Sequence, residues 1–334
     1  MDSVTQIVLG AAVGEAVLGR KVGDKAILWG AIAGTIPDLD VLAKLFTDEL
    51  TATEMHRGFS HSILFSLLLS PLLGWLAFRL HKKEGIGWKP WSLLMFASLV
   101  THPLLDAHTN WGTSLFWPFA YKVAYNNIFI IDPLYTVPFL VFVILAMRLK
   151  RDNPRRRKLN RLGLIISSSY MVFTLLCKGI GYYHFQRTLK NKQIAYSRMI
   201  TNPTPFNCIL WTALVETKNT YLVGYYSLLD GRDDANFFEI KKNHALLGKM
   251  KDESLVQRVI KLSQGWYLVV KDGEKTYIND MRFGQMGMGD DPDSFVFSHA
   301  CWYEDGVLKV RQRQPPFDNF AENLAATFRR IGGK

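Results

Sequence analysis

Long apolar runs separated by short basic loops fill the first 185 residues of this chain and constrain its fold more than any other feature. A helix needs about 20 apolar residues to cross about 30 Å of hydrocarbon. Four runs approach that length, and two shorter, glycine-rich runs suit closely packed small-residue helices or a re-entrant pair. The pattern predicts an α-helical integral membrane domain with about six spans or half-spans, at residues 4–19, 26–37, 62–78, 91–105, 126–147 and 162–177.

The charge of the chain supports this interpretation. Its 40 Lys and Arg exceed its 29 Asp and Glu, giving a net charge of +11, a value that would ordinarily suggest a nucleic-acid partner. The basic residues, however, gather in alternate loops at 20–25, 79–89 and 148–161, as the positive-inside rule predicts. We therefore expect membrane lipids and no nucleic acid as partners. The same rule makes these loops cytoplasmic and both termini extracytoplasmic, in the cytoplasmic (inner) membrane.

Residues 186–334 are polar and contain no further span. Alternating side chains predict a strand at 220–226, and an Asp-Gly pair predicts a hairpin over 266–278. A second hairpin is expected over 302–310. Helices are expected over 244–264 and 317–331. The sequence thus predicts a membrane-embedded domain over 1–185, followed by a small soluble, extracytoplasmic α+β domain over 186–334.

The three cysteines carry little information. Cys177, Cys208 and Cys301 form no C-x-x-C pattern, so the sequence gives no sign of zinc bound through thiolates. Cys177 lies in an apolar run and is expected to be buried. Cys208 and Cys301 could pair if the polar half is extracytoplasmic.

Three clusters of His and Asp stand at the ends of apolar runs: Asp38 and Asp40 after Pro37, His56 and His61, and His102 with Asp106. The orientation deduced from Lys and Arg alone places all three on one membrane face. Such groups are costly at membrane depth without a partner, and a metal ion would serve several of them at once. Nitrogen and oxygen donors suit zinc, manganese or iron. Their number suggests two or three ions, as in phosphoester hydrolases.

Each cluster also has an interpretation without metal. His102 and Asp106 are spaced i, i+4 and could bond to each other on one helical face. His56 and His61 could lie exposed in an interfacial loop, and the two aspartates could belong to an ordinary polar loop. Arg57, between the histidines, could clamp a phosphate oxygen or anchor the chain at the interface.

The motifs in order resemble the membrane-bound metal-dependent hydrolase family (YdjM-like). The likeness rests on Met1-Asp2 with Thr5-Gln6, on 30–40, on 56–62, on 102–112 and on Ile131-Asp132-Pro133, and it covers about the first 185 residues. More distantly, the pattern is similar to zinc-dependent phospholipase C and single-strand nucleases. That likeness implies shared ligands at His102 and Asp106, with Asp38, His56 and His61 completing the cluster. Many relatives have His where this chain has Gln6, and Gln is a poor zinc ligand.

The expected function is that of a membrane-bound metal-dependent hydrolase. It would cleave a phosphoester or ester bond of a lipid or lipid-linked substrate with metal-activated water. The catalytic residues would be Asp38 or Asp40, acting on the water, and Arg57. The metal ligands would be Asp38, Asp40, His56, His61, His102 and Asp106. The alternative is a metal-binding transporter, a sensor, or a structural membrane protein without hydrolytic activity; transporters usually bind near the midplane, whereas these residues gather at one end.

Overall fold

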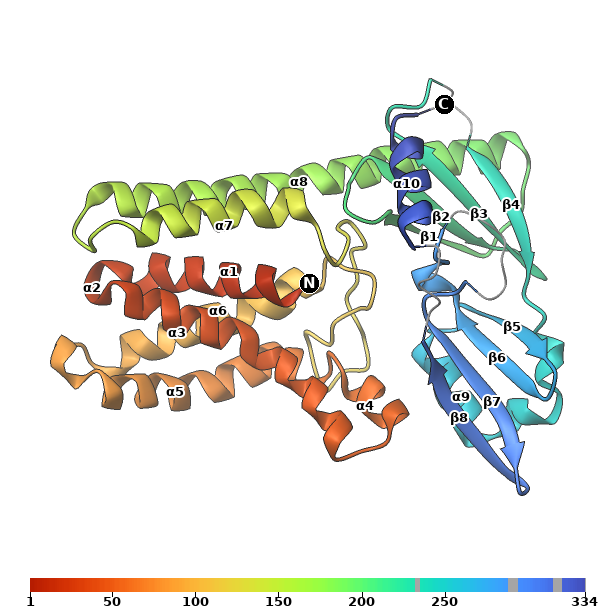
Figure 1. Ribbon diagram of the computed structural model, residues 1–334, viewed down its shortest axis with the longest axis horizontal. Helices are drawn as coiled ribbons and strands as arrows, with labels where there is room; N and C mark the ends of the chain where they lie inside the picture. The colour runs from red at the N-terminus through yellow and green to blue at the C-terminus, as the bar shows by residue number, and fades with distance from the viewer. Residues whose placement is uncertain (232–234, 288–293, 315–319, 334) are drawn as a thin grey trace. The chain divides into compact units, whose positions relative to one another are not determined.

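A computed structural model describes residues 1–231, 235–287, 294–314 and 320–333 (Figure 1). The chain divides into two compact units. The first, the helical unit, comprises Met1–Thr47, Met55–Leu176 and Pro205–Asn207. The second, the C-terminal unit, comprises Asp48–Glu54, Cys177–Thr204 and Cys208–Lys334. Both are described separately below.

The helical unit is built from α-helices joined by short 3-10 segments and one π-helical turn, η1. Its elements are α1 (Ser3–Gly14), η1 (Glu15–Gly19), α2 (Arg20–Val22), α3 (Asp24–Thr35), η2 (Ile36–Leu45), η3 (Phe59–His61), α5 (Ile63–Leu80), η4 (Lys82–Glu84), α6 (Trp88–Asp106), α7 (Pro133–Met147) and the first part of α8 (Pro154–Asn191).

Glycines bring α1 and α3 unusually close. A Cβ atom added to Gly10 would lie 2.3 Å from the carbonyl oxygen of Gly30, and one added to Gly14 would lie 2.2 Å from that of Ala26. Neither distance can accommodate a side chain, so only glycine permits this crossing. The prediction of two closely packed small-residue helices is confirmed.

Three described helical segments are long and apolar enough to cross a membrane: Asp24–Leu45, Ile63–Leu80 and Pro154–Asn191. Helix α7 is apolar but shorter. The run predicted over 126–147 begins as a helix only at Pro133, because Asp132 caps it by accepting hydrogen bonds from the backbone N–H groups of Leu134 and Tyr135. The early part of that prediction is therefore wrong.

The C-terminal unit contains two four-stranded antiparallel sheets in simple sequential order. The first consists of β1 (Arg198–Pro203), β2 (Leu210–Glu216), β3 (Thr220–Ser227) and β4 (Asn236–Lys241). The second consists of β5 (Tyr267–Asp272), β6 (Lys275–Asp280), β7 (Ser298–Glu304) and β8 (Val307–Arg313). The predicted strand is β3, and the predicted hairpins are β5–β6 and β7–β8.

The helices of this unit match the sequence less closely. Residues 244–264 form two helices, η5 (His244–Asp252) and α9 (Ser254–Leu262), because Glu253 between them has an extended backbone (φ −70°, ψ 135°). Gly248, with φ +48°, also kinks η5 internally. Helix α10 spans Phe320–Ile331, and the first residues of the prediction for 317–331 lie outside the described part. All three cysteines are buried and none forms a disulfide within the described residues, so Cys208 and Cys301 are not joined by one.

One short helix from the first half of the chain belongs to the C-terminal unit. This is α4 (Glu49–Met55): all of it but Met55 falls in that unit, together with Asp48 before it. Leu50 packs in the core formed by α9 and the second sheet, and Glu54 pairs with Arg258 of α9 at 2.8 Å. The link between η2 and η3 is thus held by the second unit.

Candidate metal centre

Four side chains converge at one end of the helical unit: Asp38, His61, His102 and Asp106. One donor atom from each lies within 4.8 Å of every other. The Nε2 atoms of the two histidines are 3.2 Å apart. Asp38 Oδ1 lies 3.3 Å from His61 Nε2 and 3.4 Å from His102 Nε2, and Asp106 Oδ2 lies 3.4 and 3.6 Å from the same atoms. We refer to these four residues as the His–Asp cage.

The cage is assembled from three separate elements. Asp38 follows Pro37 at the start of η2, where the proline ends the α-helical path of α3. His61 closes η3, just before α5 begins. His102 and Asp106 lie one turn apart on α6, and their i, i+4 spacing places both on one face. The sequence predicted this meeting of all four residues.

Burial is uneven within the cage. The side chains of His61, His102 and Asp106 are fully buried, whereas that of Asp38 is 22% exposed. Asp38 is therefore the one member of the cage whose side chain reaches the protein surface.

Hydrogen bonds at the far side of each imidazole ring set its orientation. His102 Nδ1 lies 2.6 Å from the carbonyl oxygen of Gly34, which can only accept, so Nδ1 carries the proton. His61 Nδ1 lies 3.2 Å from Asp40 Oδ2 and 2.9 Å from Ser60 Oγ. When each ring is neutral and donates from Nδ1, its Nε2 lone pair faces the cage, as in metal-binding histidines held by an outer carbonyl or carboxylate.

Asp40 and His56 lie behind the cage. Asp40 Oδ1 is 2.8 Å from His56 Nδ1, and Asp40 Oδ2 accepts hydrogen bonds from the backbone N–H of Arg57 at 3.0 Å and from Ser60 Oγ at 2.9 Å. Of the six residues predicted as ligands, the structure thus brings four together. It places Asp40 as the support of His61, and His56 as a neighbour of Asp40.

Asp106 is held from several directions. Its Oδ1 contacts the amino group of Met1 and accepts a hydrogen bond from Gln6 Nε2 at 2.8 Å. Its Oδ2 is buried, lies 3.0 Å from Arg57 Nε, and makes no hydrogen bond of acceptable geometry to the described residues. Asp106 Oδ2, the oxygen that faces the cage, therefore accepts no hydrogen bond from the described residues. Gln6 acts on the opposite oxygen rather than as a member of the cage.

Arg57 is turned inward. It adopts a left-handed backbone conformation (φ 56°), its side chain is 3% exposed, and Nη1 donates to Thr109 Oγ1 at 2.6 Å. Its charge therefore acts on Asp106. The sequence had suggested either a phosphate clamp or an interfacial anchor, and the burial of Arg57 does not fit an anchor.

The atoms that converge in the cage are all hydrogen-bond acceptors when both histidines carry their proton on Nδ1. Two carboxylate oxygens and two imidazole lone pairs face one another, and like groups at these distances repel without a positive centre. Burial alone would lower the pKa of His61, but the carboxylates of Asp106, Asp38 and Asp40 around the ring raise this pKa to about 10. Without a metal, a proton on His61 would supply the missing charge. With one, the four donors could hold a single ion.

Some groups at this site were not evident in the sequence. The amino group of Met1, the carbonyl of Gly34 and the hydroxyl of Thr109 all reach the cage or its supports through tertiary contacts. Ser60 lies inside the predicted His56–His61 motif and could have been noted there. The sequence does not assign these contacts to Met1, Gly34 or Thr109, because each contact joins residues that lie far apart in the chain.

A helical unit with apolar spans and a His–Asp cage at one end defines a class of integral membrane protein with a candidate metal site. The chain belongs to the YdjM inner membrane protein family, whose profile matches residues 1–183. It is 36% identical over 101 residues to the inner membrane protein YbcI of Escherichia coli (strain K12), a match that covers 30% of this chain and 57% of that protein. No solved structure matches the chain. Family and relative thus place it among inner membrane proteins.

Proposed function

We propose that the chain is a membrane-bound metal-dependent hydrolase that cleaves a phosphoester or ester bond of a lipid or lipid-linked substrate. The observation that carries the proposal is the His–Asp cage, in which four acceptor atoms converge; one of them, the buried Asp106 Oδ2, accepts no hydrogen bond from the described residues. A divalent ion held there would lower the pKa of a water molecule and polarise the scissile bond.

The spacing of the donors favours zinc. Donors about 2.0–2.1 Å from a tetrahedral zinc ion lie about 3.3–3.4 Å from one another. The five measured separations within the cage range from 3.2 Å between the two Nε2 atoms to 3.6 Å between His102 Nε2 and Asp106 Oδ2. Two imidazoles and two carboxylates also form a donor set that zinc accepts, although manganese and iron share it. The four residues account for one ion; a second or third would need Asp40 and His56.

The partial exposure of Asp38 favours catalysis over a purely structural site. Structural zinc sites are closed by four protein ligands, whereas catalytic sites keep a position open to water or substrate. Asp38 is the accessible member of the cage, so its carboxylate is the one that can accept a proton from an incoming water. Asp40 orients His61 from behind. Arg57 adds positive charge next to Asp106, and that charge would favour an anionic substrate.

The surroundings of Asp38 favour a lipid substrate. Several apolar side chains of η2 and the residue after it are exposed, with Leu45 at 74% and Phe46 at 85%. Apolar side chains exposed on the segment that carries Asp38 suit contact with lipid at the membrane interface. A substrate with an apolar tail could then approach the cage from the bilayer.

A hydrolysis assay tests the proposal. Purified protein in lipid nanodiscs, loaded with zinc or manganese, is offered a panel of phospholipids and carboxylic ester lipids, and released phosphate, headgroup or fatty acid is measured. We expect turnover that is lost in His102→Ala and in Asp38→Asn. His81→Ala is the matched control, because this histidine bonds to Trp29 Nε1 far along the chain from the cage. Metal binding without turnover on any lipid would favour the transport, sensing or structural alternative.

Kinetics separate the roles of the residues. Loss of a cage residue should abolish turnover, whereas Arg57→Ala should mainly raise KM if the arginine contributes to binding an anionic substrate. Arg57→Lys should rescue only partly, since Lys lacks the planar fork of Arg. An equal loss of kcat in Arg57→Ala and Asp38→Asn would instead assign Arg57 to holding Asp106 in place.

A further inference from the structure

The second feature of interest is the end of the helical unit where α2 meets the loop from α7 to α8 (Figure 1). Residues 15–25, 79–89 and 148–161 contain fifteen Lys and Arg and four Asp and Glu. Their net charge is +11, which equals the net charge of the whole chain. We call these three segments the basic end; the rest of the chain is electrically balanced.

The basic end contains a pocket of about 520 Å³. Ligand pockets usually measure about 300–1,000 Å³. Seven residues line it, and five of them are charged: Gly23, Asp24, Leu149, Lys150, Arg151, Asp152 and Arg156.

One of the residues that line the pocket, Arg156, is held in place by hydrogen bonds to the protein. Arg156 is buried and binds Glu15 through two hydrogen bonds, from Nε at 2.8 Å and from Nη2 at 2.7 Å. Its Nη1 donates to Asp24 Oδ1 at 2.8 Å and to the carbonyl oxygen of Leu149 at 2.9 Å. Arg156 is therefore committed to the protein and cannot serve a ligand.

Three exposed charged residues of the pocket, Lys150, Arg151 and Asp152, could bind a ligand. Lys150 and Asp152 are exposed and make no ion pair with the described residues. Arg151 is 56% exposed, and among the described residues it donates from Nη1 alone, to the carbonyl oxygen of Lys21 at 3.0 Å and to Glu84 at 3.3 Å. Two cations and one carboxylate thus face the pocket opening with binding capacity left.

We propose that this pocket binds the headgroup of a phospholipid, with the phosphodiester on Lys150 and Arg151. Basic pockets between membrane helices bind lipid phosphates in this manner. The carboxylate of Asp152 next to these cations favours a headgroup with a hydrogen-bond donor beyond the phosphate, as in ethanolamine. The basic end of an inner membrane protein lies where such headgroups are abundant. This lipid site is separate from the His–Asp cage and does not depend on hydrolysis.

Native mass spectrometry of the full chain in detergent, titrated with phosphatidylethanolamine, tests the proposal. Lys150→Gln/Arg151→Gln should weaken lipid binding at least about tenfold, because each basic residue near a lipid phosphate contributes about 1 kcal/mol. Arg155→Gln/Lys158→Gln is the matched control: it removes two exposed charges from the same basic end but none from the pocket. The control should change the affinity less than threefold, allowing about 0.6 kcal/mol of general electrostatics.

Equal weakening by both double variants would overturn the pocket and leave only general attraction to the membrane. Unchanged binding in the first variant would also overturn it. Lys150→Gln alone guards against misfolding, since this exposed side chain makes no ion pair with the described residues; it should still weaken binding severalfold.

Two further comparisons identify the ligand. Glycerophosphoethanolamine, which carries the same phosphodiester and ammonium group, should compete with the lipid, whereas inorganic phosphate should compete poorly; full displacement by millimolar inorganic phosphate would make the site one for free phosphate and overturn the lipid assignment. Phosphatidylcholine, which has no N–H donor, should bind more weakly than phosphatidylethanolamine. Asp152→Asn should remove that preference, and a preference that survives would overturn the role of Asp152.

Discussion

Two buried carboxylates, Glu15 and Asp106, lie at opposite ends of the helical unit and are balanced in opposite ways. Glu15 binds the guanidinium of Arg156 through both oxygens, so the protein itself completes its charge. Asp106 is contacted by Met1, Gln6 and Arg57, yet its Oδ2 makes no good hydrogen bond and faces two imidazole nitrogens and another carboxylate. At one end protein groups complete the charge balance of the carboxylate, whereas at the other four side-chain atoms that could bind a positive ion converge.

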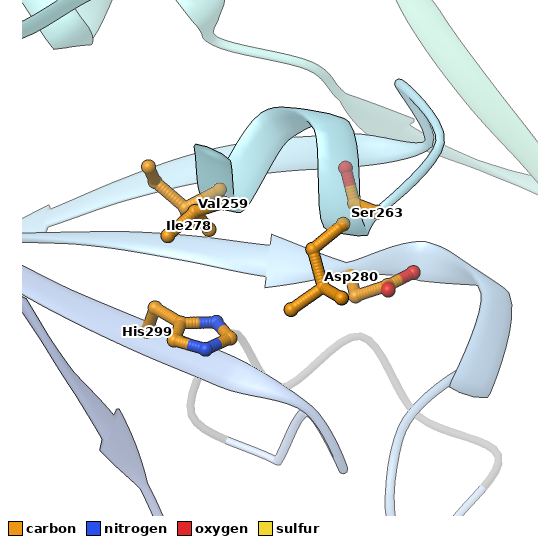
Figure 2. A pocket seen from close by; sticks show the side chains of 6 residues that line it. Val259, Ser263, Ile278, Asp280 and His299 are labelled. Atoms are coloured by element: carbon orange, nitrogen blue, oxygen red, sulfur yellow. The ribbon is translucent and has the colours of Figure 1, made fainter. Parts of the chain in front are cut away.

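This comparison teaches that burial of charge is not by itself a sign of function. A carboxylate matched by a two-point arginine pair is a structural element, because no polar atom is left over. A carboxylate whose free oxygen points at other acceptors requires something further. A pocket in the C-terminal unit shows a third environment for a buried ionisable group (Figure 2). There the imidazole of His299 lies among apolar side chains, one serine and one carboxylate, Asp280, and not among several acidic groups.

The largest effect is expected when the buried ion pair of Glu15 and Arg156 is broken. Arg156→Leu leaves Glu15 buried without its partner, and removing one member of a buried ion pair costs about 3–5 kcal/mol. We expect a large drop in the melting temperature, measured by thermal unfolding in detergent. The double variant Glu15→Leu/Arg156→Leu should recover most of that loss. A double variant no more stable than the single one would show that Glu15 is not balanced by Arg156.

The next largest effect concerns the His–Asp cage and the change in melting temperature when a bound metal ion is removed. A chelator should lower the melting temperature of the wild-type protein, because a ligand present at 100 times its Kd stabilises the folded state by about 2.7 kcal/mol. Asp106→Asn should be insensitive to chelator, since it has lost a ligand. His81→Ala should respond as the wild type does. Equal sensitivity in all three proteins would place the stabilising ion outside the cage.

The third prediction uses His299 as an imidazole outside any acidic cluster. Burial lowers its pKa to about 4, whereas the unfolded chain titrates near 6.5. Below pH 6.5 the unfolded state therefore binds more protons, and stability falls as the pH falls. Between pH 6.5 and 5 the loss is about 2 kcal/mol. Denaturant unfolding of the wild type and of His299→Gln at both pH values checks this: the variant should lack that part of the pH dependence, and identical slopes would refute it.

The smallest expected effect is on metal affinity, and it distinguishes the four cage residues from Asp40, which supports His61 from outside the cage. Asp40→Asn keeps the four donors but weakens the partner of His61, and loss of such an outer partner costs about 10–100-fold in metal affinity. Competition with a chelating dye should show weaker binding at unchanged stoichiometry. Asp48→Asn serves as the control, because Asp48 lies outside the helical unit. A lost equivalent of metal in Asp40→Asn would make Asp40 a ligand, as first predicted from the sequence.

Local patterns predicted much of the fold. Apolar runs predicted α5 and much of α6 and α8, and alternation with Asp-Gly turns predicted β3 and both hairpins. These features are encoded over a few consecutive residues. The predicted helix boundaries failed where a single residue starts or kinks a helix, as Asp132 does at the start of α7 and Gly248 does within η5. The placement of α4 in the C-terminal unit depends on Arg258 and on distant core contacts, which no local pattern contains.

The candidate site shows the same limit. Its residue types followed from the sequence, and four of the six predicted ligands meet at one end of the helical unit. The division into cage and support did not follow, because it depends on which ring nitrogen faces Gly34 or Asp40. The sequence also could not show that Gln6 binds Asp106 from the side away from the cage.

Metal analysis of the purified protein tests the central claim most directly. Elemental mass spectrometry of wild-type protein should find at least one equivalent of zinc, manganese or iron per chain. His102→Ala/Asp106→Ala should lose one equivalent, while Glu15→Leu/Arg156→Leu, which alters the opposite end, should keep it. Full occupancy in the His102/Asp106 double variant, or wild-type protein that holds no metal even after incubation with these ions, would contradict the account and leave His61 protonated as the charge that holds the cage together.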